Sequence, residues 1–279
     1  SLNVSYQNGE KISAENPLSV AVDSSLISSI SWLANSDTDK EPGCPKYNGG
    51  TKAPRPVLRD AAILTVVSTA PESGSFRPPY CGTDKKSAFN KSQLNYDILP
   101  NLKPLSDKMN MPGHERRVKR PWIEHGHQYL GAMIHPTNNM PEYGRDLSTQ
   151  LGIAALILRL DFNQFADKPS KEKLMLGFVQ IGIDFAGIAD QGGSWPSNGG
   201  HLMGRKWPIL FAGLVLDNEH MKNVGHWETD FQEDLDNFSV SQADIDMKHS
   251  DAWRHDKRTT KTPYEESHNG LPAWGIRHR

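Results

Sequence analysis

Apolar residues recur at helical spacing in the second half of the chain, and this pattern predicts three helices. The first begins near Arg145, the second follows Pro169, and the third has Pro208 in its first turn, where the fixed φ of proline suits a helix. The apolar positions are Leu147, Leu151, Ala154, Ala155 and Leu158, then Leu174, Phe178, Ile181 and Phe185, then Ile209, Leu210, Phe211, Leu214 and Val215. Because this spacing gathers each group on one helix face, residues 145–216 are expected to be mostly helical, without a sheet.

The first half of the chain has a different texture. Residues 1 to about 58 are polar and turn-rich, with a short β-like run at Leu18–Val22, and a second such run follows at Ala61–Val67. The β-branched content of the second run predicts a buried strand, with a short helix as the alternative. Residues 71–144 hold many of the 19 prolines and little periodicity, so an irregular region is expected there. We therefore predict a β-containing segment over 1–70 and a helical region over 71–279, together forming one continuous domain.

Composition and charge remove several classes of function. With 279 residues the chain can bury a substantial core. A net charge of −2 gives no overall signature of nucleic-acid binding, and no apolar run approaches the roughly 18 residues of a membrane span. Cys44 and Cys81 fit either one disulfide of an exported protein or two thiols. No cysteine or histidine spacing matches a metal motif, so neither a metal nor an organic cofactor is expected.

The connection between the second and third predicted helices carries the strongest candidate chemistry. Residues 192–209 contain five glycines, two Trp-Pro pairs, His201 and an Arg-Lys pair. Arginine and lysine pair with carboxylates, and histidine can take a proton near neutral pH. Tryptophan faces stack on sugar rings. The loop therefore suggests a site for an acidic polysaccharide, with the binding residues Arg205, Lys206, Trp195 and Trp207.

Each candidate also has a purely structural interpretation, which the sequence leaves open. His201 fits a surface turn, and the segment around Asn139 fits a helix cap. Tyr80 follows two prolines and fits rigid packing. Tyr264 follows a basic run, which would lower the pKa of its phenol from about 10 and make it a usable base, but such runs are usually solvated loops.

Three short segments together resemble a family of bacterial polysaccharide lyases that act on alginate or related uronate polymers. They are Phe76–Gly82, Asn139–Arg145, and Asn198–His201 followed by Gly204–Pro208. The resemblance runs from about residue 60 to the end of the chain. It implies an (α/α) toroid or barrel, with the glycan crossing loops at its rim, and an exported protein, secreted or periplasmic. Because the chain is short for this fold and no closing apolar helix precedes Arg279, the toroid is expected to be incomplete.

The resemblance also implies a set of site residues. The asparagine and histidine of the family fall on Asn139 and His201, within the shared motifs. Its arginine and tyrosine fall on Arg258 and Tyr264, by context. Further contacts to the acidic polymer are expected from the motif residues Tyr80, Tyr143 and Arg145.

These residues could perform β-elimination without a metal. Asn139 and Arg258 would neutralise the uronate carboxylate and so stabilise the charge that develops when the C5 proton leaves. His201 or Tyr264 would remove that proton, and Tyr264 could return one to the departing O4 oxygen. One alternative is a glycoside hydrolase, which needs two carboxylates about 5–9.5 Å apart. Its candidates are Asp184, Asp190, Glu142 and Glu228. The other alternative is a non-catalytic glycan-binding module that uses Trp195, Trp207 and Arg205.

Overall fold

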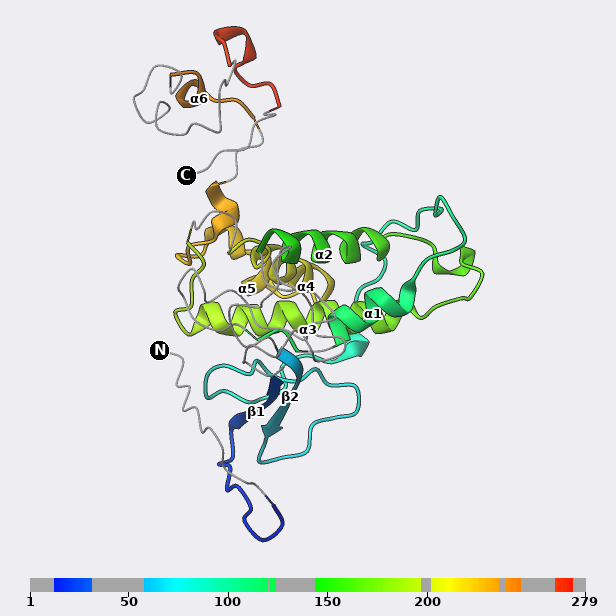
Figure 1. The fold of residues 1–279 in the computed structure, drawn as a ribbon, viewed down its shortest axis with the longest axis vertical. Coiled ribbons are helices and arrows are strands. Elements are labelled where there is room, and N and C mark those ends of the chain that lie inside the picture. The colour runs from blue at the N-terminus through cyan, green and yellow to red at the C-terminus, as the bar shows by residue number, and fades with distance from the viewer. Residues whose placement is uncertain are drawn as a thin grey trace, which may run out of the picture.

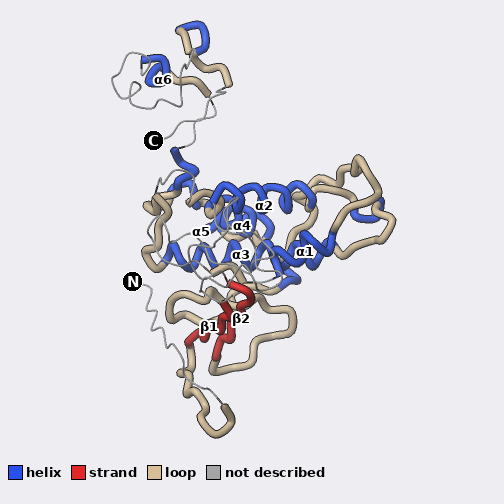
Figure 2. Tube along the Cα trace, viewed as in Figure 1, coloured by secondary structure: helices blue, strands red, loops and turns tan. Residues whose placement is uncertain are grey.

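The computed structural model is mainly helical, with one small sheet (Figure 1). It describes residues 13–31, 58–119, 121–123, 144–196, 202–235, 239–246 and 264–272. The helices are α1 (Met111–Lys119), α2 (Gly144–Ile157), α3 (Lys171–Asp190), α4 (Lys206–Val215), α5 (Glu219–Lys222) and α6 (Gln242–Asp246). Short 3-10 turns cover Lys91–Gln93, Phe162–Gln164, Val224–His226, Gln232–Leu235 and Glu266–His268. Loops make up much of the remainder (Figure 2).

The three helices predicted from apolar spacing are confirmed as α2, α3 and α4. Helix α3 crosses the middle of the main body in Figure 1, with α2 and α4 on one side and the sheet on the other. The residues that defined its apolar face, such as Leu174 and Phe178, are buried in the main core. No strand interrupts the described part of residues 145–216.

Close helix packing depends on two glycines of α3. A Cβ on Gly182 would stand 2.2 Å from the carbonyl oxygen of Pro208 in α4. A Cβ on Gly177 would stand 2.6 Å from the carbonyl oxygen of Val118 in α1. Both distances are below van der Waals contact, so any larger residue would push the helices apart.

Helix α1 lies in the region that was expected to be irregular, and that expectation was wrong over Met111–Lys119. Two residues, Met111 and Val118, are its buried anchors, which is too few to produce a visible apolar period. Arg116, Arg117 and Lys119 fall in its last turn, where positive charge favours the helix dipole. These three basic residues therefore belong to a helix C-terminus.

The strands lie within residues 1–70, as predicted, and form an antiparallel pair. Strand β1 (Ser24–Ser31) pairs with β2 (Leu58–Val66), with Leu26 opposite Leu64. The expected strand at Leu18–Val22 was wrong, because β1 begins only after a turn at Asp23, whose φ is +60°. The expected burial of the second strand was also wrong, since Leu64 is 60% exposed.

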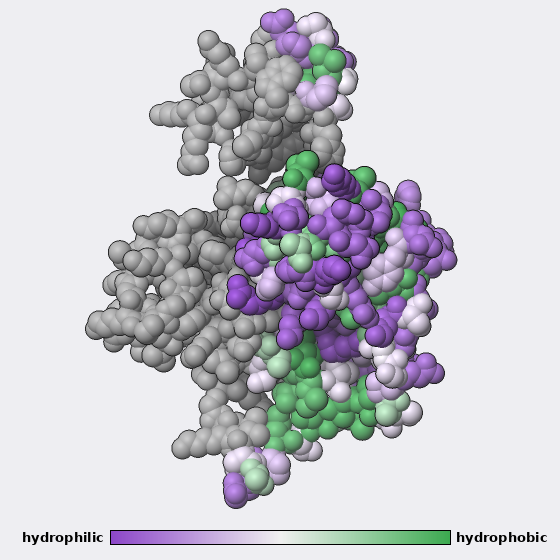
Figure 3. All heavy atoms as spheres, turned by 90° about the vertical axis from the view of Figure 1, so that its right-hand side faces the viewer, coloured by the Kyte–Doolittle hydropathy of each residue, from purple (hydrophilic) through white to green (hydrophobic). Residues whose placement is uncertain are grey.

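The surface of the helical body differs in hydropathy from the surface near the sheet. In the view of Figure 3, hydrophilic side chains cover the helical body, and hydrophobic ones gather at the level of the β1–β2 sheet. A second, smaller cluster of buried residues, separate from the main core, contains Val240, Ile245 and Tyr264.

Candidate functional site

The loop between α3 and α4 is anchored at its first end by Trp195. The indole is only 2% exposed, stacks on Phe231 with ring centroids 5.3 Å apart, and meets the edge of Phe185 at 6.0 Å. The backbone N–H of Trp195 also donates to the carbonyl oxygen of Asp230 at 2.6 Å. Trp195 therefore packs in the core, and its rings are not open to a sugar as the sequence suggested.

The second end of the loop is anchored just as firmly. Leu202 is buried, and its N–H donates to Oε1 of Gln232 at 3.0 Å. Arg205 is fully buried, and its Nη1 donates to the carbonyl oxygen of Met203 at 2.7 Å. In this arrangement Arg205 supports the loop from inside, and its guanidinium is not displayed to a polymer.

A carboxylate from the same chain covers the N-terminus of α4. Oε1 of Glu233 accepts hydrogen bonds from the N–H groups of Gly204, Arg205 and Lys206, at 2.7, 2.8 and 3.1 Å. These N–H groups have no acceptor within the helix, and the helix dipole favours a negative charge beside them. This capping role of Glu233 was not predicted, and its signal in the sequence is the high density of acidic residues over 228–236.

Lys206 is also bound by the chain's own acids. Its ammonium forms an ion pair with Asp234 and lies 5.4 Å from the ring centroid of Phe231. The carboxylate that Lys206 binds in the structure is therefore that of Asp234, from the same chain. Trp207, the other loop tryptophan, is half-buried against the edge of Phe211 at 6.0 Å. Of the two loop tryptophans, Trp207 keeps the more accessible ring.

Four of the expected site residues lie outside the described residues, namely His201, Asn139, Tyr143 and Arg258. Arg145 lies in the first turn of α2, where only its backbone is described. The predicted convergence of His201, Asn139 and Tyr143 on one cleft therefore stays a prediction, whereas Arg205, the fourth residue of that set, is buried.

Tyr264 is described, and its position bears on its expected role. The residue is 3% exposed, lies in the small cluster with Val240 and Ile245, and meets the ring of His268 edge-on at 6.5 Å. A base in an open cleft would be more exposed. Proton transfer by Tyr264 stays a prediction, which this burial does not favour.

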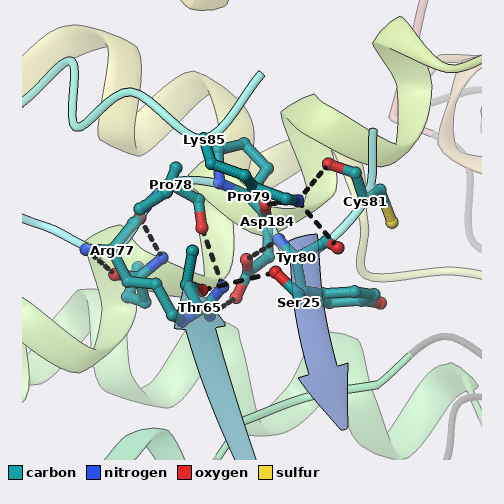
Figure 4. A network of polar contacts seen from close by, with 10 residues as sticks. Ser25, Thr65, Arg77, Pro78, Pro79, Tyr80, Cys81, Lys85 and Asp184 are labelled. Carbon is teal, nitrogen blue, oxygen red and sulfur yellow. Dashed lines mark hydrogen bonds and ion pairs between the residues drawn. The ribbon is translucent and has the colours of Figure 1, made fainter. Parts of the chain in front are cut away.

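Tyr80 belongs to a proline-rich loop that is clamped onto α3 (Figure 4). Gln180 of α3 exchanges two hydrogen bonds with the backbone of Arg77, at 3.1 and 3.0 Å. Nη2 of Arg77 pairs with Oδ2 of Asp184 at 2.5 Å, and the Tyr80 N–H donates to Oδ1 of Asp184 at 3.3 Å. Tyr80 is buried, and its neighbours fit the rigid-packing interpretation better than a contact to polymer.

Lys85 binds the backbone of the same loop. The residue is only 2% exposed. Its ammonium donates to the carbonyl oxygens of Pro79, Tyr80 and Cys81 at 2.7, 3.0 and 2.9 Å. Burial lowers the pKa of Lys85. Burial raises the pKa of Asp184, against the opposing effects of Arg77, the Tyr80 N–H and Lys85. Lys85 and Asp184 both stabilise the loop. Lys85 was not singled out in the sequence, and Asp184 was considered there only as a hydrolase carboxylate.

The carboxylates proposed for a hydrolase are placed differently from one another. Asp184 is occupied by Arg77 in the interior. Asp190, at the end of α3, lies 2.8 Å from Nε2 of His220. Glu228 is exposed, and Glu142 lies outside the described residues. Because Asp184 is already paired and buried, it is a poor member of a catalytic pair, which must face substrate.

Comparisons with known proteins add no relatives. No protein-family model matches the chain, and no curated protein or solved structure matches it either. The resemblance to polysaccharide lyases therefore rests on the short segments named above.

The described ranges contain no group of three or more histidine, cysteine, aspartate or glutamate side chains that could hold a metal ion. No helix in this part of the chain is long and apolar enough to cross a membrane. Cys81 is buried, and Cys44 lies outside these ranges.

Proposed function

We propose that this chain is a polysaccharide lyase that cleaves an alginate-like uronate polymer by metal-independent β-elimination. The observation that carries the proposal is the anchoring of the loop between α3 and α4. Trp195 on one side of Ser197–His201 and Leu202 on the other are buried and hydrogen-bonded. A catalytic group works best when rigid elements hold it in position. His201 is joined by its peptide bond to Leu202, which is buried and hydrogen-bonded.

In this proposal His201 is the leading base. It would take the C5 proton while Asn139 and Arg258 hold the uronate carboxylate, which stabilises the developing negative charge. The C4–O4 bond would break as the C4–C5 double bond forms, and O4 would leave with a proton from Tyr264 or from water. Since Tyr264 is buried, its part requires an opening of the small cluster around it.

Binding of the polymer is assigned more narrowly than the sequence suggested. The residues that remain candidates for polymer binding are Lys206 and Trp207, at the start of α4, and Tyr143 and Arg145 from another part of the chain. Trp195, Arg205 and Tyr80 are proposed to support the site, because all three are buried. The helices would form part of an (α/α) toroid, and the protein would act outside the cytoplasm, where such polymers occur.

The test is incubation with a panel of uronate polymers, followed by ultraviolet absorbance of unsaturated products. A lyase generates this absorbance, a hydrolase releases only reducing ends, and a binding module releases nothing. We expect His201→Ala to lower turnover by about 10²–10⁴. The matched control is His226→Ala, since His226 is exposed in a 3-10 turn and has no part in the proposal.

Tyr264→Phe separates the two candidate bases. It removes one hydroxyl and keeps the ring that packs with Val240 and Ile245. Turnover at the wild-type rate would exclude Tyr264 from proton transfer and leave His201 as the base. Absence of unsaturated product from every uronate polymer would overturn the proposed function.

A further inference from the structure

A cavity of about 220 Å³ lies between the clamped loop and the C-terminal half of α3. Its floor is apolar and includes Phe76, Pro78, Ile183, Ala186 and Met221, all buried. Its rim is polar and includes Lys86, Asp190, Gln191, Asn218 and His220. An apolar floor with a few polar groups around it is the usual composition of a small-molecule site.

The walls of this cavity are fixed by contacts that involve no ligand. A Cβ on Gly187 of α3 would lie 2.2 Å from Cβ of Pro79, so the loop rests directly on the helix backbone. The Lys85 ammonium binds three carbonyl oxygens of the same loop, those of Pro79, Tyr80 and Cys81 (Figure 4). Binding would therefore require little reorganisation of the backbone, which lowers the entropic cost of capturing a ligand.

The orientation of the rim is fixed as well. Nε2 of His220 lies 2.8 Å from Oδ1 of Asp190, and the imidazole stacks on Trp227 with centroids 4.5 Å apart. Oδ1 of Asn218 accepts from the N–H of Met221 at 2.9 Å, which directs the rest of the amide. These contacts hold donors and acceptors side by side around the floor.

The rim chemistry selects the class of ligand. The basic residues Lys86 and His220 and the acidic residues Asp84 and Asp190 all line the cavity, so neither a simple anion nor a simple cation is favoured. The amides of Gln191 and Asn218 can both donate and accept. Hydroxyl groups also do both, and a ring that carries them on its edge offers an apolar face to the floor. The volume lies below the roughly 300–1,000 Å³ of drug-sized pockets, which fits one ring better than a chain.

We propose that this cavity binds a single pyranose ring, as a carbohydrate site separate from the proposed catalytic loop. The ring would lie over Phe76 and Pro78 with its hydroxyls toward Gln191, Asn218 and the Asp190–His220 pair. This goes beyond the proposed function, because a sugar-binding site here would serve a lyase, a hydrolase or a binding module alike.

The test is saturation-transfer NMR and calorimetry on the full chain with neutral pyranoses and with hexuronates. The two arms distinguish a neutral ring from one whose carboxylate reaches Lys86. Ala88→Trp places an indole in the cavity from an exposed lining position, and it should abolish binding. The matched control is Ala70→Trp, at an exposed loop alanine that does not line this cavity, and it should bind as the native chain does.

A second pair of variants guards against misfolding of Ala88→Trp. His220→Phe keeps a ring to stack on Trp227 but removes the bond to Asp190, and Lys86→Met changes only an exposed side chain. His220→Phe should weaken binding of every sugar by roughly tenfold, as expected for one lost hydrogen bond. Lys86→Met should weaken the binding of hexuronates more than that of neutral rings.

Several results would overturn the assignment. They are absence of binding by any sugar, binding that survives both Ala88→Trp and His220→Phe, and tighter binding of simple amines or carboxylates than of sugars. The lyase assay is read independently, so inactivity toward uronate polymers leaves this test unchanged, and absence of ring binding leaves the lyase test unchanged.

Discussion

Replacing Glu233 by alanine should destabilise the protein by removing the acceptor shared by three backbone N–H groups. These belong to Gly204, Arg205 and Lys206, at 2.7, 2.8 and 3.1 Å from Oε1. Alanine offers no replacement, and water reaches the site only in part, because Glu233 is half-buried. The first turn of α4 and the second anchor of its preceding loop would both loosen.

The magnitude follows from the geometry. A lost N-cap side chain costs about 0.5–2 kcal/mol, and a hydrogen bond to a charged group contributes about 1.5–3 kcal/mol. One oxygen shared by three donors, with partial replacement by water, therefore gives about 3 kcal/mol for Glu233→Ala. At about 2–4 °C per kcal/mol for a chain of this size, the melting temperature should fall by about 6–12 °C.

A charge-removing variant separates hydrogen bonding from the helix dipole. Glu233→Gln keeps an acceptor oxygen and loses only the charge, so it should cost about 1 kcal/mol. Glu228→Ala is the matched control, because Glu228 lies in the same acidic run and is exposed. Thermal unfolding followed by circular dichroism gives the order, and hydrogen exchange of the α4 amides locates the effect. Equal melting temperatures for Glu233→Ala and Glu228→Ala would refute the capping argument.

Three other perturbations test the packing and the charges. Lys85→Met should lower the free energy of unfolding in urea by about 3–5 kcal/mol, because three carbonyl oxygens lose their donor. The control Lys86→Met, at an exposed lysine, should change it by no more than about 0.5 kcal/mol. Similar urea midpoints for the two variants would contradict a stabilising role of Lys85 in the loop. Gly182→Ala should cost about 1–3 kcal/mol, since its Cβ would meet the Pro208 carbonyl oxygen at 2.2 Å, whereas Gly152→Ala, with open space around it, should be neutral or stabilising in the same assay. Burial, reinforced by the positive charge of Arg117, lowers the pKa of His114 below its usual 6.5. As the pH falls, His114 is therefore protonated in the unfolded chain before it is protonated in the folded one. The folded state loses stability as the pH falls from 6.5 through the lowered pKa. His114→Gln should flatten the dependence of melting temperature on pH between about 7 and 5, and an unchanged slope would exclude His114 as a source of that dependence.

Long apolar periods were readable from the sequence, and single anchors were not. Helix α3 repeats its apolar spacing over about three turns, so Leu174, Phe178, Ile181 and Phe185 identify its buried face without further information. Helix α1 rests on Met111 and Val118 only, and its position depends on the close approach of Gly177 in another helix. Such a contact is a tertiary property and leaves no local signature.

In the candidate site, too, the sequence located the segment but not the contacts of its side chains. The glycine-rich loop could be located, because glycine and proline interrupt two helical patterns. The roles of its side chains could not, since Trp195 and Arg205 find partners in the run from Asp230 to Glu233, some thirty residues away along the chain. Aromatic and cationic residues in a loop look the same in sequence whether they meet a ligand or an internal partner.

The clamp on the proline-rich loop has a consequence for the order of events during synthesis. The bonds from Lys85 span four to six residues and can form as soon as the loop is made. Asp184, the partner of Arg77, follows 107 residues later. At about 5–20 residues per second, the ribosome needs about 5–20 s to deliver it. The guanidinium stays hydrated for that interval, so the loop docks on α3 late, after most of the segment between them has emerged.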